Sequence, residues 1–346
     1  MEFGALHPGL FNSLRALALT CALTSASSAG AVEVLPPLLA MSDPNLGVAA
    51  GQLLAVSADP PSIQFRVDES LRGDGAGELR MRVNRQDLAL LAPGSDYIAV
   101  YTDQMPAPLK PRKIIRVPDS RRLMTFEGVQ LSLFRDTPDL RALLAADPIT
   151  AAGHSDYRSR VIAGLASSDP QISDLWSGEL ALRAERLSPF TATELAAIEA
   201  FVRSARSPER ARARLLLMAH DRQPVFGNDW FVQAAAAVID ETPVRAEPDI
   251  ASQNLVYAAL TIVNAHPQSV SEATLEAWLA SSPVLAESAA LALRRVSPEF
   301  ERAALDRVLS RALLSSVTRQ FLQQHRQRLP ARPTSAKPVA GERSSP

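Results

Sequence analysis

The feature that most constrains this chain is a change in hydrophobic period part-way along it. Between about 45 and 134 apolar residues alternate with polar ones, as Ile63, Phe65 and Val67 do. Between about 137 and 329 they recur every three or four positions instead. Period two is typical of half-buried strands and period 3.6 of amphipathic helices. We therefore expect an α+β chain in which a β region precedes a helical one.

The β region divides into short strands separated by turn residues. Strands are predicted over 48–56, 62–69, 79–83, 96–101, 114–117 and 129–133. Glycines from Gly73 to Gly77 mark a hairpin loop, and Pro93-Gly94 marks a turn. The run 96–101 is almost continuously apolar, which is typical of a central strand. Short antiparallel strands in about 90 residues predict a small barrel or sandwich.

Three short motifs in this region resemble a known family. They are Gly51 to Val56, Phe65 to Gly73 and Gly94 to Val100. They look like the exported netrin-like or metalloproteinase-inhibitor-like modules, which have an OB-type barrel. The cysteines usual in that family are missing here, so the resemblance implies a barrel without the inhibitor activity.

The helical region is punctuated by start signals in which Ser or Asp precedes Pro. A Ser or Asp side chain caps free amides, and Pro at the first helical position has no N–H to satisfy. The signals are Asp169-Pro170, Ser188-Pro189, Ser207-Pro208, Ser282-Pro283 and Ser297-Pro298. We expect a helix to begin at each of them.

The helical region also repeats itself. The stretch from Leu165 through Pro170 to Arg183 parallels the stretch from Leu279 through Pro283 to Arg294. Repeated helix pairs predict stacking, because one pair alone leaves its apolar face exposed. The segment resembles degenerate HEAT-type repeats, which implies an α-solenoid of antiparallel helix pairs. An irregular helical domain is the alternative, since Ala- and Leu-rich helices imitate one another easily.

The two ends of the chain differ from its interior. Arg15 precedes a short apolar run, and Ala29-Gly-Ala31 provides an A-x-A cleavage signal, so 1–31 is predicted to be a signal peptide. We therefore expect a periplasmic or secreted protein with no membrane span after cleavage. The only cysteine, Cys21, is removed with the signal. The stretch 330–346 is rich in Pro and Ser and predicts a disordered tail.

Catalytic motifs are hard to find. No H-x-H, H-E-x-x-H, G-x-S-x-G or Walker phosphate loop occurs, so we expect no metal, cofactor or catalytic site. The net charge of −1 argues against a nucleic-acid partner. His154 is the best local acid–base candidate, although it also suits an ordinary helix start. Cysteine chemistry is excluded once Cys21 is gone.

Binding features are more evident. Arginines cluster at one helix–helix corner, where their planar guanidinium groups suit a carboxylate- or phosphate-bearing partner. The candidate partner-binding residues are Arg203, Arg206, Arg210 and Arg214, with Trp230 as a possible aromatic anchor. A solvated helix face and a core tryptophan are the alternative interpretations. Arg212 lies within the same cluster.

These observations predict an exported, non-catalytic protein-binding or scaffolding protein. Its partner is expected to be another exported or envelope protein. Two other hypotheses stay open. One is a periplasmic hydrolase with a carboxylate or His154 site near the junction of the two regions. The other is a structural protein of the cell envelope.

Overall fold

The computed structural model describes most of the chain between residues 37 and 329. The described ranges are 37–44, 46–73, 77–83, 85–102, 121–123, 132–145, 154–226, 229–311 and 314–329. The predicted signal peptide, the predicted tail and the predicted strand at 114–117 lie outside them.

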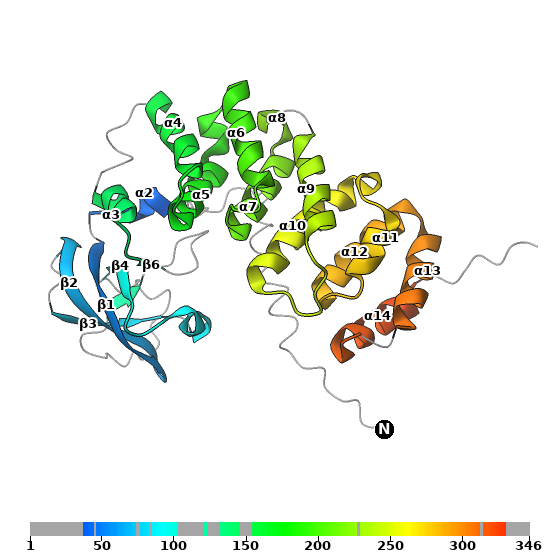
Figure 1. The fold of residues 1–346 in the computed structure, drawn as a ribbon, viewed down its shortest axis with the longest axis horizontal. Coiled ribbons are helices and arrows are strands. Elements are labelled where there is room, and N and C mark those ends of the chain that lie inside the picture. The colour runs from blue at the N-terminus through cyan, green and yellow to red at the C-terminus, as the bar shows by residue number, and fades with distance from the viewer. Residues whose placement is uncertain are drawn as a thin grey trace, which may run out of the picture. The chain divides into compact units, whose positions relative to one another are not determined.

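The chain is α+β, with a sheet followed by helices (Figure 1). The strands are β1 (Gly47–Ala58), β2 (Pro61–Arg72), β3 (Glu78–Arg82), β4 (Asp96–Thr102), β5 (Arg121–Leu123) and β6 (Leu133–Arg135). A short helix, α2 (Pro37–Met41), precedes β1, and the 3₁₀ turn η1 (Arg85–Leu90) follows β3. The predicted strands at 48–56, 62–69, 79–83 and 96–101 are confirmed. The last predicted strand, 129–133, overlaps β6 at Leu133 only, and its residues 129–131 lie outside the described ranges.

The sheet has the strand order β1-β2-β3-β5-β4-β6, and β1 also pairs with β4. All of these pairs are antiparallel except β3 with β5, which is parallel. One face of the sheet carries its own core, which we call the sheet core. The sheet core consists of Ala49, Leu53, Ile63, Phe65, Leu79, Met81, Tyr97, Ala99, Tyr101 and Leu133.

The opposite face of β1 and β4 packs elsewhere. Val48 and Ala50 on β1, and Ile98 and Val100 on β4, belong to a second core that also contains buried residues from the helices. We call this second core the shared core. β4 is thus buried on both faces, as its apolar sequence predicted. The change of period near residue 136 therefore does not separate two independent cores.

Helices fill the rest of the described chain. They are α3 (Pro138–Ala145), α4 (His154–Leu165), α5 (Pro170–Leu187), α6 (Ala192–Arg203), α7 (Glu209–Asp221), α8 (Gln223–Phe226), α9 (Trp230–Glu241), α10 (Ile250–Ala265), α11 (Glu272–Trp278), α12 (Pro283–Val296), α13 (Pro298–Leu309) and α14 (Ser316–Arg328), with the 3₁₀ turn η2 (Pro267–Ser269) between α10 and α11.

Most predicted helix starts are observed. Asp169 accepts a hydrogen bond from the Gln171 N–H and Pro170 opens α5, while Ser297 and Pro298 open α13 in the same way. Pro283 likewise opens α12 after Ser282. At Ser207-Pro208 the helix begins one residue later, at Glu209.

The start predicted at Ser188-Pro189 is wrong. Ser188 ends α5, and its N–H donates to the Ala184 carbonyl at 3.0 Å. The next helix begins after Thr191, which forms a capping box with Glu194. The Thr191 side chain accepts from the Glu194 N–H, and the Glu194 carboxylate accepts from the Thr191 N–H. Two amides are satisfied at that point, so Thr191 is the stronger start signal.

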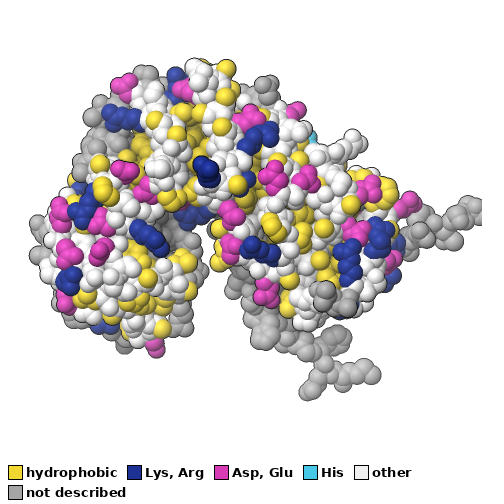
Figure 2. All heavy atoms as spheres, viewed as in Figure 1, with side chains coloured by type: hydrophobic (Ala, Val, Ile, Leu, Met, Phe, Trp, Pro, Cys, Tyr) yellow, Lys and Arg dark blue, Asp and Glu magenta, His cyan; other side chains and the backbone are white. Residues whose placement is uncertain are grey.

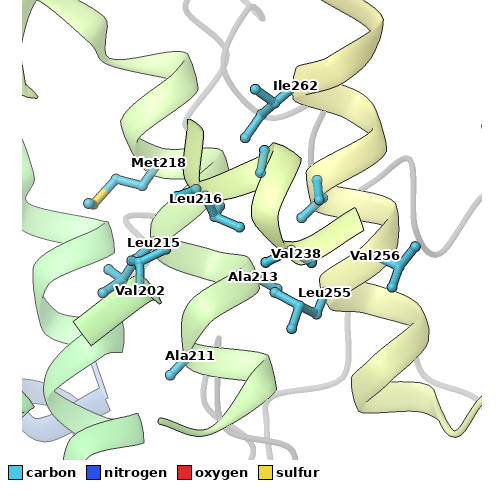
Figure 3. Close-up of a cluster of buried hydrophobic side chains, with 14 of the residues drawn as sticks. Val202, Ala211, Ala213, Leu215, Leu216, Met218, Val238, Leu255, Val256 and Ile262 are labelled. Atoms are coloured by element: carbon cyan, nitrogen blue, oxygen red, sulfur yellow. The ribbon is translucent and has the colours of Figure 1, made fainter. Parts of the chain in front are cut away.

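The helices pack in two rows. In one row α5 contacts α7, α7 contacts α10, α10 contacts α12, and α12 contacts α14. In the other row α4 contacts α6, and α6 contacts α9. Figure 3 shows one junction between the rows, where Leu215 of α7 lies beside Val202 of α6 and Leu216 of α7 points towards Val238 of α9.

Candidate partner-binding site

The four arginines predicted to bind a partner lie on α6, on α7 and in the turn between them. Arg203 ends α6 and is exposed, and its Nε lies 2.8 Å from Oε1 of Glu199, one turn earlier. Arg206 is exposed in the turn. Arg210 and Arg214 follow on α7, one helical turn apart. Exposed i,i+4 ion pairs stabilise a helix only slightly, and the Arg203 side chain stays 40% exposed beside Glu199.

Arg210 and Arg214 are engaged within the chain. The Arg210 guanidinium forms an ion pair with the Asp174 carboxylate of α5. Arg214 Nη1 donates to Ser177 Oγ at 2.6 Å and to the Asp174 carbonyl at 3.0 Å. The sequence prediction grouped these two arginines with Arg203 and Arg206, but in the structure they join α7 to α5.

Arg212 is buried between them. Its Nε donates to the Val202 carbonyl at 2.8 Å, which satisfies an orphan acceptor near the end of α6. Burial lowers the pKa of Arg212, and the charges of Glu209 and Glu241 oppose that shift. Arg212 therefore acts as an internal link between α6 and α7.

Trp230 lies apart from the arginines. It opens α9 and is buried, with its ring 6.3 Å from the Phe231 ring in an edge-to-face arrangement. Its Nε1 is buried and has no hydrogen-bond partner. The ring of the next residue, Phe231, lies 5.9 Å from the ring of His220 in the last turn of α7. Arg210 is in the first turn of α7, about 15 Å from His220 along the helix. The predicted residues therefore do not form one site.

Sequence reasoning missed a buried polar cluster on α5. The Glu179 side chain is fully buried, and its Oε1 accepts from the Leu38 N–H of α2 at 2.5 Å. Its Oε2 accepts from the Tyr157 hydroxyl of α4. The Arg183 guanidinium lies 5.1 Å from the centre of the Tyr157 ring. Burial and the Glu179 charge raise the pKa of Tyr157, so its hydroxyl stays a donor. A lone acid in the run Gly178-Glu-Leu-Ala-Leu was the available signal.

A second buried carboxylate links the last helices. Arg294 of α12 donates two hydrogen bonds to Glu301 of α13, at 2.7 and 2.8 Å. His325 Nε2 of α14 lies 2.9 Å from Glu301 Oε1. Burial alone raises the pKa of Glu301, but the hydrogen bonds from His325 and Arg294 outweigh it and the pKa is lowered. The cluster therefore holds an ionised carboxylate between three helices.

Both buried carboxylates are held by groups from other helices. Within the described ranges, His, Cys, Asp and Glu side chains do not gather into any group of three or more that could hold a metal ion. His154 begins α4, but its side chain lies outside the described residues. Glu179 and Glu301 both accept hydrogen bonds from neighbouring helices, which gives each a structural role.

The surface itself is mixed in charge. On the face shown in Figure 2, acidic and basic side chains are interspersed with apolar ones.

Among the helices that the structure describes, none combines the length and the apolar character needed to cross a bilayer. Comparison with protein-family models, with curated proteins and with solved structures finds no match to this chain.

Proposed function

We propose that this chain is an exported, non-catalytic protein that binds or scaffolds another exported or envelope protein. The observation that carries the proposal is the row α5, α7, α10, α12 and α14, in which each helix contacts the next. Stacked helix pairs of the HEAT type pack in this way and offer an extended surface along each row. We accordingly read the helical region as a short α-solenoid.

The last helix supports the same interpretation. α14 buries Thr318 and Leu322 against the preceding helices, while Gln320, Gln323 and Gln327 are exposed. Repeat arrays need a terminal unit with a polar outer face to remain soluble. α14 has the character expected of such a cap.

The strand pairings support a small barrel for the β region. β1 pairs with β2 and β4, β2 pairs with β3, and β5 pairs with both β3 and β4. These five strands therefore form a ring of neighbours, as in an OB-type barrel. In this proposal the barrel supports the first helices through the shared core.

The proposed contact surface is the exposed face of α12, together with the turn that carries Arg206. Glu287 and Leu291 lie one turn apart on α12, and both are exposed. Leu291 is 40% exposed and offers an apolar contact on this face. An apolar side chain beside a carboxylate suits a protein partner better than a small polar ligand.

Photo-crosslinking in the native cell tests the proposal. A photoreactive residue is placed at Leu291 or Arg206 in the full chain, and at Gln233, which is exposed on α9 in the other row, as the matched control. We expect Leu291 and Arg206 to yield one discrete adduct with an envelope protein and Gln233 to yield little. Equal background from all three positions would contradict the proposal.

A further inference from the structure

The short helix α2 lies beside α5 (Figure 1) and is held there by two apolar side chains. Leu38 and Met41 are each 2% exposed, and both belong to the shared core. A helix of five residues is far too short to be stable alone. Its conformation therefore depends on docking. We call Pro37–Met41 the strap.

The polar contacts of the strap involve main-chain atoms. The Leu38 N–H donates to the buried carboxylate of Glu179. On the other side, Arg72 of β2 donates from Nε to the Leu46 carbonyl at 3.1 Å and from Nη2 to the Met41 carbonyl. A site that binds main-chain atoms accepts any segment that supplies suitable apolar side chains, because these bonds do not depend on residue type.

The surface beneath the strap is shaped for it. Gly178 of α5 lies directly under Pro37, and a Cβ at Gly178 would come within 2.9 Å of Pro37 Cγ and 3.4 Å of Arg214 Nη1. A glycine in the middle of a helix costs about 1 kcal/mol relative to alanine. The absence of a side chain at Gly178 therefore lowers the intrinsic stability of α5 but leaves the space that Pro37 of the strap occupies. We define the strap site as Gly178, Glu179, Tyr157 and Arg214.

We propose that the strap site is a recognition site for a short apolar peptide segment, and that the chain's own strap occupies it as an intramolecular competitor. The inference rests on the proposed protein-binding function, because α5 is the first helix of the row assigned to the partner. The ligand class is a single helical turn with apolar side chains three residues apart and a free N–H at its start, as in Leu38 and Met41.

The proposal requires that the strap leave its site without unfolding of α5. Two buried apolar side chains and the main-chain hydrogen bonds of Leu38 and Met41 hold it, whereas α5 is buried along most of its length. Local opening of so small an element needs less free energy than global unfolding. A partner segment of the same chemistry would then compete with the strap for the vacated site.

Thiol labelling of the full chain measures this opening. The only native cysteine is replaced by Cys21→Ser, and Leu38→Cys is compared with Leu180→Cys, a fully buried position on α5. We expect the thiol at position 38 to react at least about tenfold faster, because it needs only local opening. Gly178→Ala should speed the reaction at position 38 further, since its Cβ displaces Pro37.

A synthetic peptide of residues 37–46 then tests recognition. Added at millimolar concentration, it should speed labelling at position 38 several-fold by capturing the open site, since it must compete with a tethered segment. The control peptide carries Asp in place of Leu38 and Met41 and should have no effect. Equal labelling at positions 38 and 180, or an unchanged rate with the first peptide, would overturn the proposal.

These outcomes are separable from those of the crosslinking experiment. If thiol labelling shows that the strap opens but photo-crosslinking finds no partner, the proposed protein-binding function is refuted and the opening of the strap is not. If photo-crosslinking finds a partner but thiol labelling shows that the strap does not open, only the proposal that the strap competes for its site is refuted.

Discussion

The β region and the helical region bury their apolar residues in different ways. In the β region one strand serves two cores, since Ala49 and Leu53 of β1 face the sheet core while Val48 and Ala50 face the shared core. In the helical region each helix packs on a few neighbouring helices, both along a row and across from one row to the other. A perturbation of the sheet should therefore spread through the whole region, while one in the helices should stay near its origin.

The largest expected effect is that of Phe65→Ala. Phe65 is fully buried in the sheet core, and removing a buried phenylalanine costs about 3 to 5 kcal/mol. We expect the free energy of unfolding of the β region to fall by that amount, measured by urea denaturation. The control is Leu90→Ala, at a position 58% exposed, which should change stability little. Similar losses in the two variants would refute the assignment of Phe65 to a tightly packed core.

Glu301→Gln should have the next largest effect, and its effect should depend on pH. Glu301 is buried while Arg294 is 41% exposed, and losing hydrogen bonds to a charged group costs about 1.5 to 3 kcal/mol. Because the folded-state pKa of Glu301 is lowered, its stabilising contribution is complete above the unfolded value of about 4.3 and is lost as pH falls through the folded value. Wild-type and variant stabilities should therefore differ at pH 7 and converge in acid.

The matched control for this pH series is Glu299→Gln, because Glu299 is exposed on the same helix. Its stability should follow the wild-type curve. Parallel wild-type and Glu301→Gln curves between pH 3 and 7 would show that the buried cluster does not hold an ionised carboxylate.

Gly164→Ala should destabilise the α4–α5 pair. A Cβ at Gly164 would lie 2.0 Å from Cδ1 of Trp176, so the ring must move. Overpacking of this kind costs about 1 to 3 kcal/mol, which exceeds the helix-propensity gain. Thermal denaturation should show the loss, and Ala163→Ser, at the exposed neighbouring position, should show almost none. A more stable Gly164→Ala variant would contradict the close α4–α5 packing.

The smallest effect expected is that of Thr191→Ala at the start of α6. Losing the capping hydrogen bond costs about 1 kcal/mol. Thr193→Ala, one position into the exposed first turn, is the control. Chemical denaturation should separate the two variants. If both were neutral, the capping box would not determine where α6 begins.

Much of the fold could be predicted from the sequence, because half-buried strands and capped helices leave local patterns. The alternation of apolar and polar residues around Phe65 predicted β2, and the pair Asp169-Pro170 predicted where α5 begins. The prediction that a helix begins at Ser188-Pro189 was wrong because a Ser-Pro pair can also follow the end of a helix. Which end it marks depends on whether Ser188 is already bonded to the preceding turn, as it is to Ala184.

The site was less predictable because its contacts join distant residues. Arg210 looked available for a partner, yet it binds Asp174, 36 positions earlier in the chain. Leu38 and Glu179 are 141 positions apart. No local pattern encodes such a pairing. Glu179 in the run Gly178-Glu-Leu-Ala-Leu was a local signal of a buried acid, but the run does not identify its partners.

The central claim is that the helices form a stack of neighbouring pairs while the sheet behaves as one unit. Native-state hydrogen exchange of the full chain tests it most directly. We expect amides of β1, β2 and β4 to share one opening free energy, and helical amides to show graded values that fall from α7 and α10 towards α14. A single opening free energy shared by every helix from α5 to α14 would contradict the account.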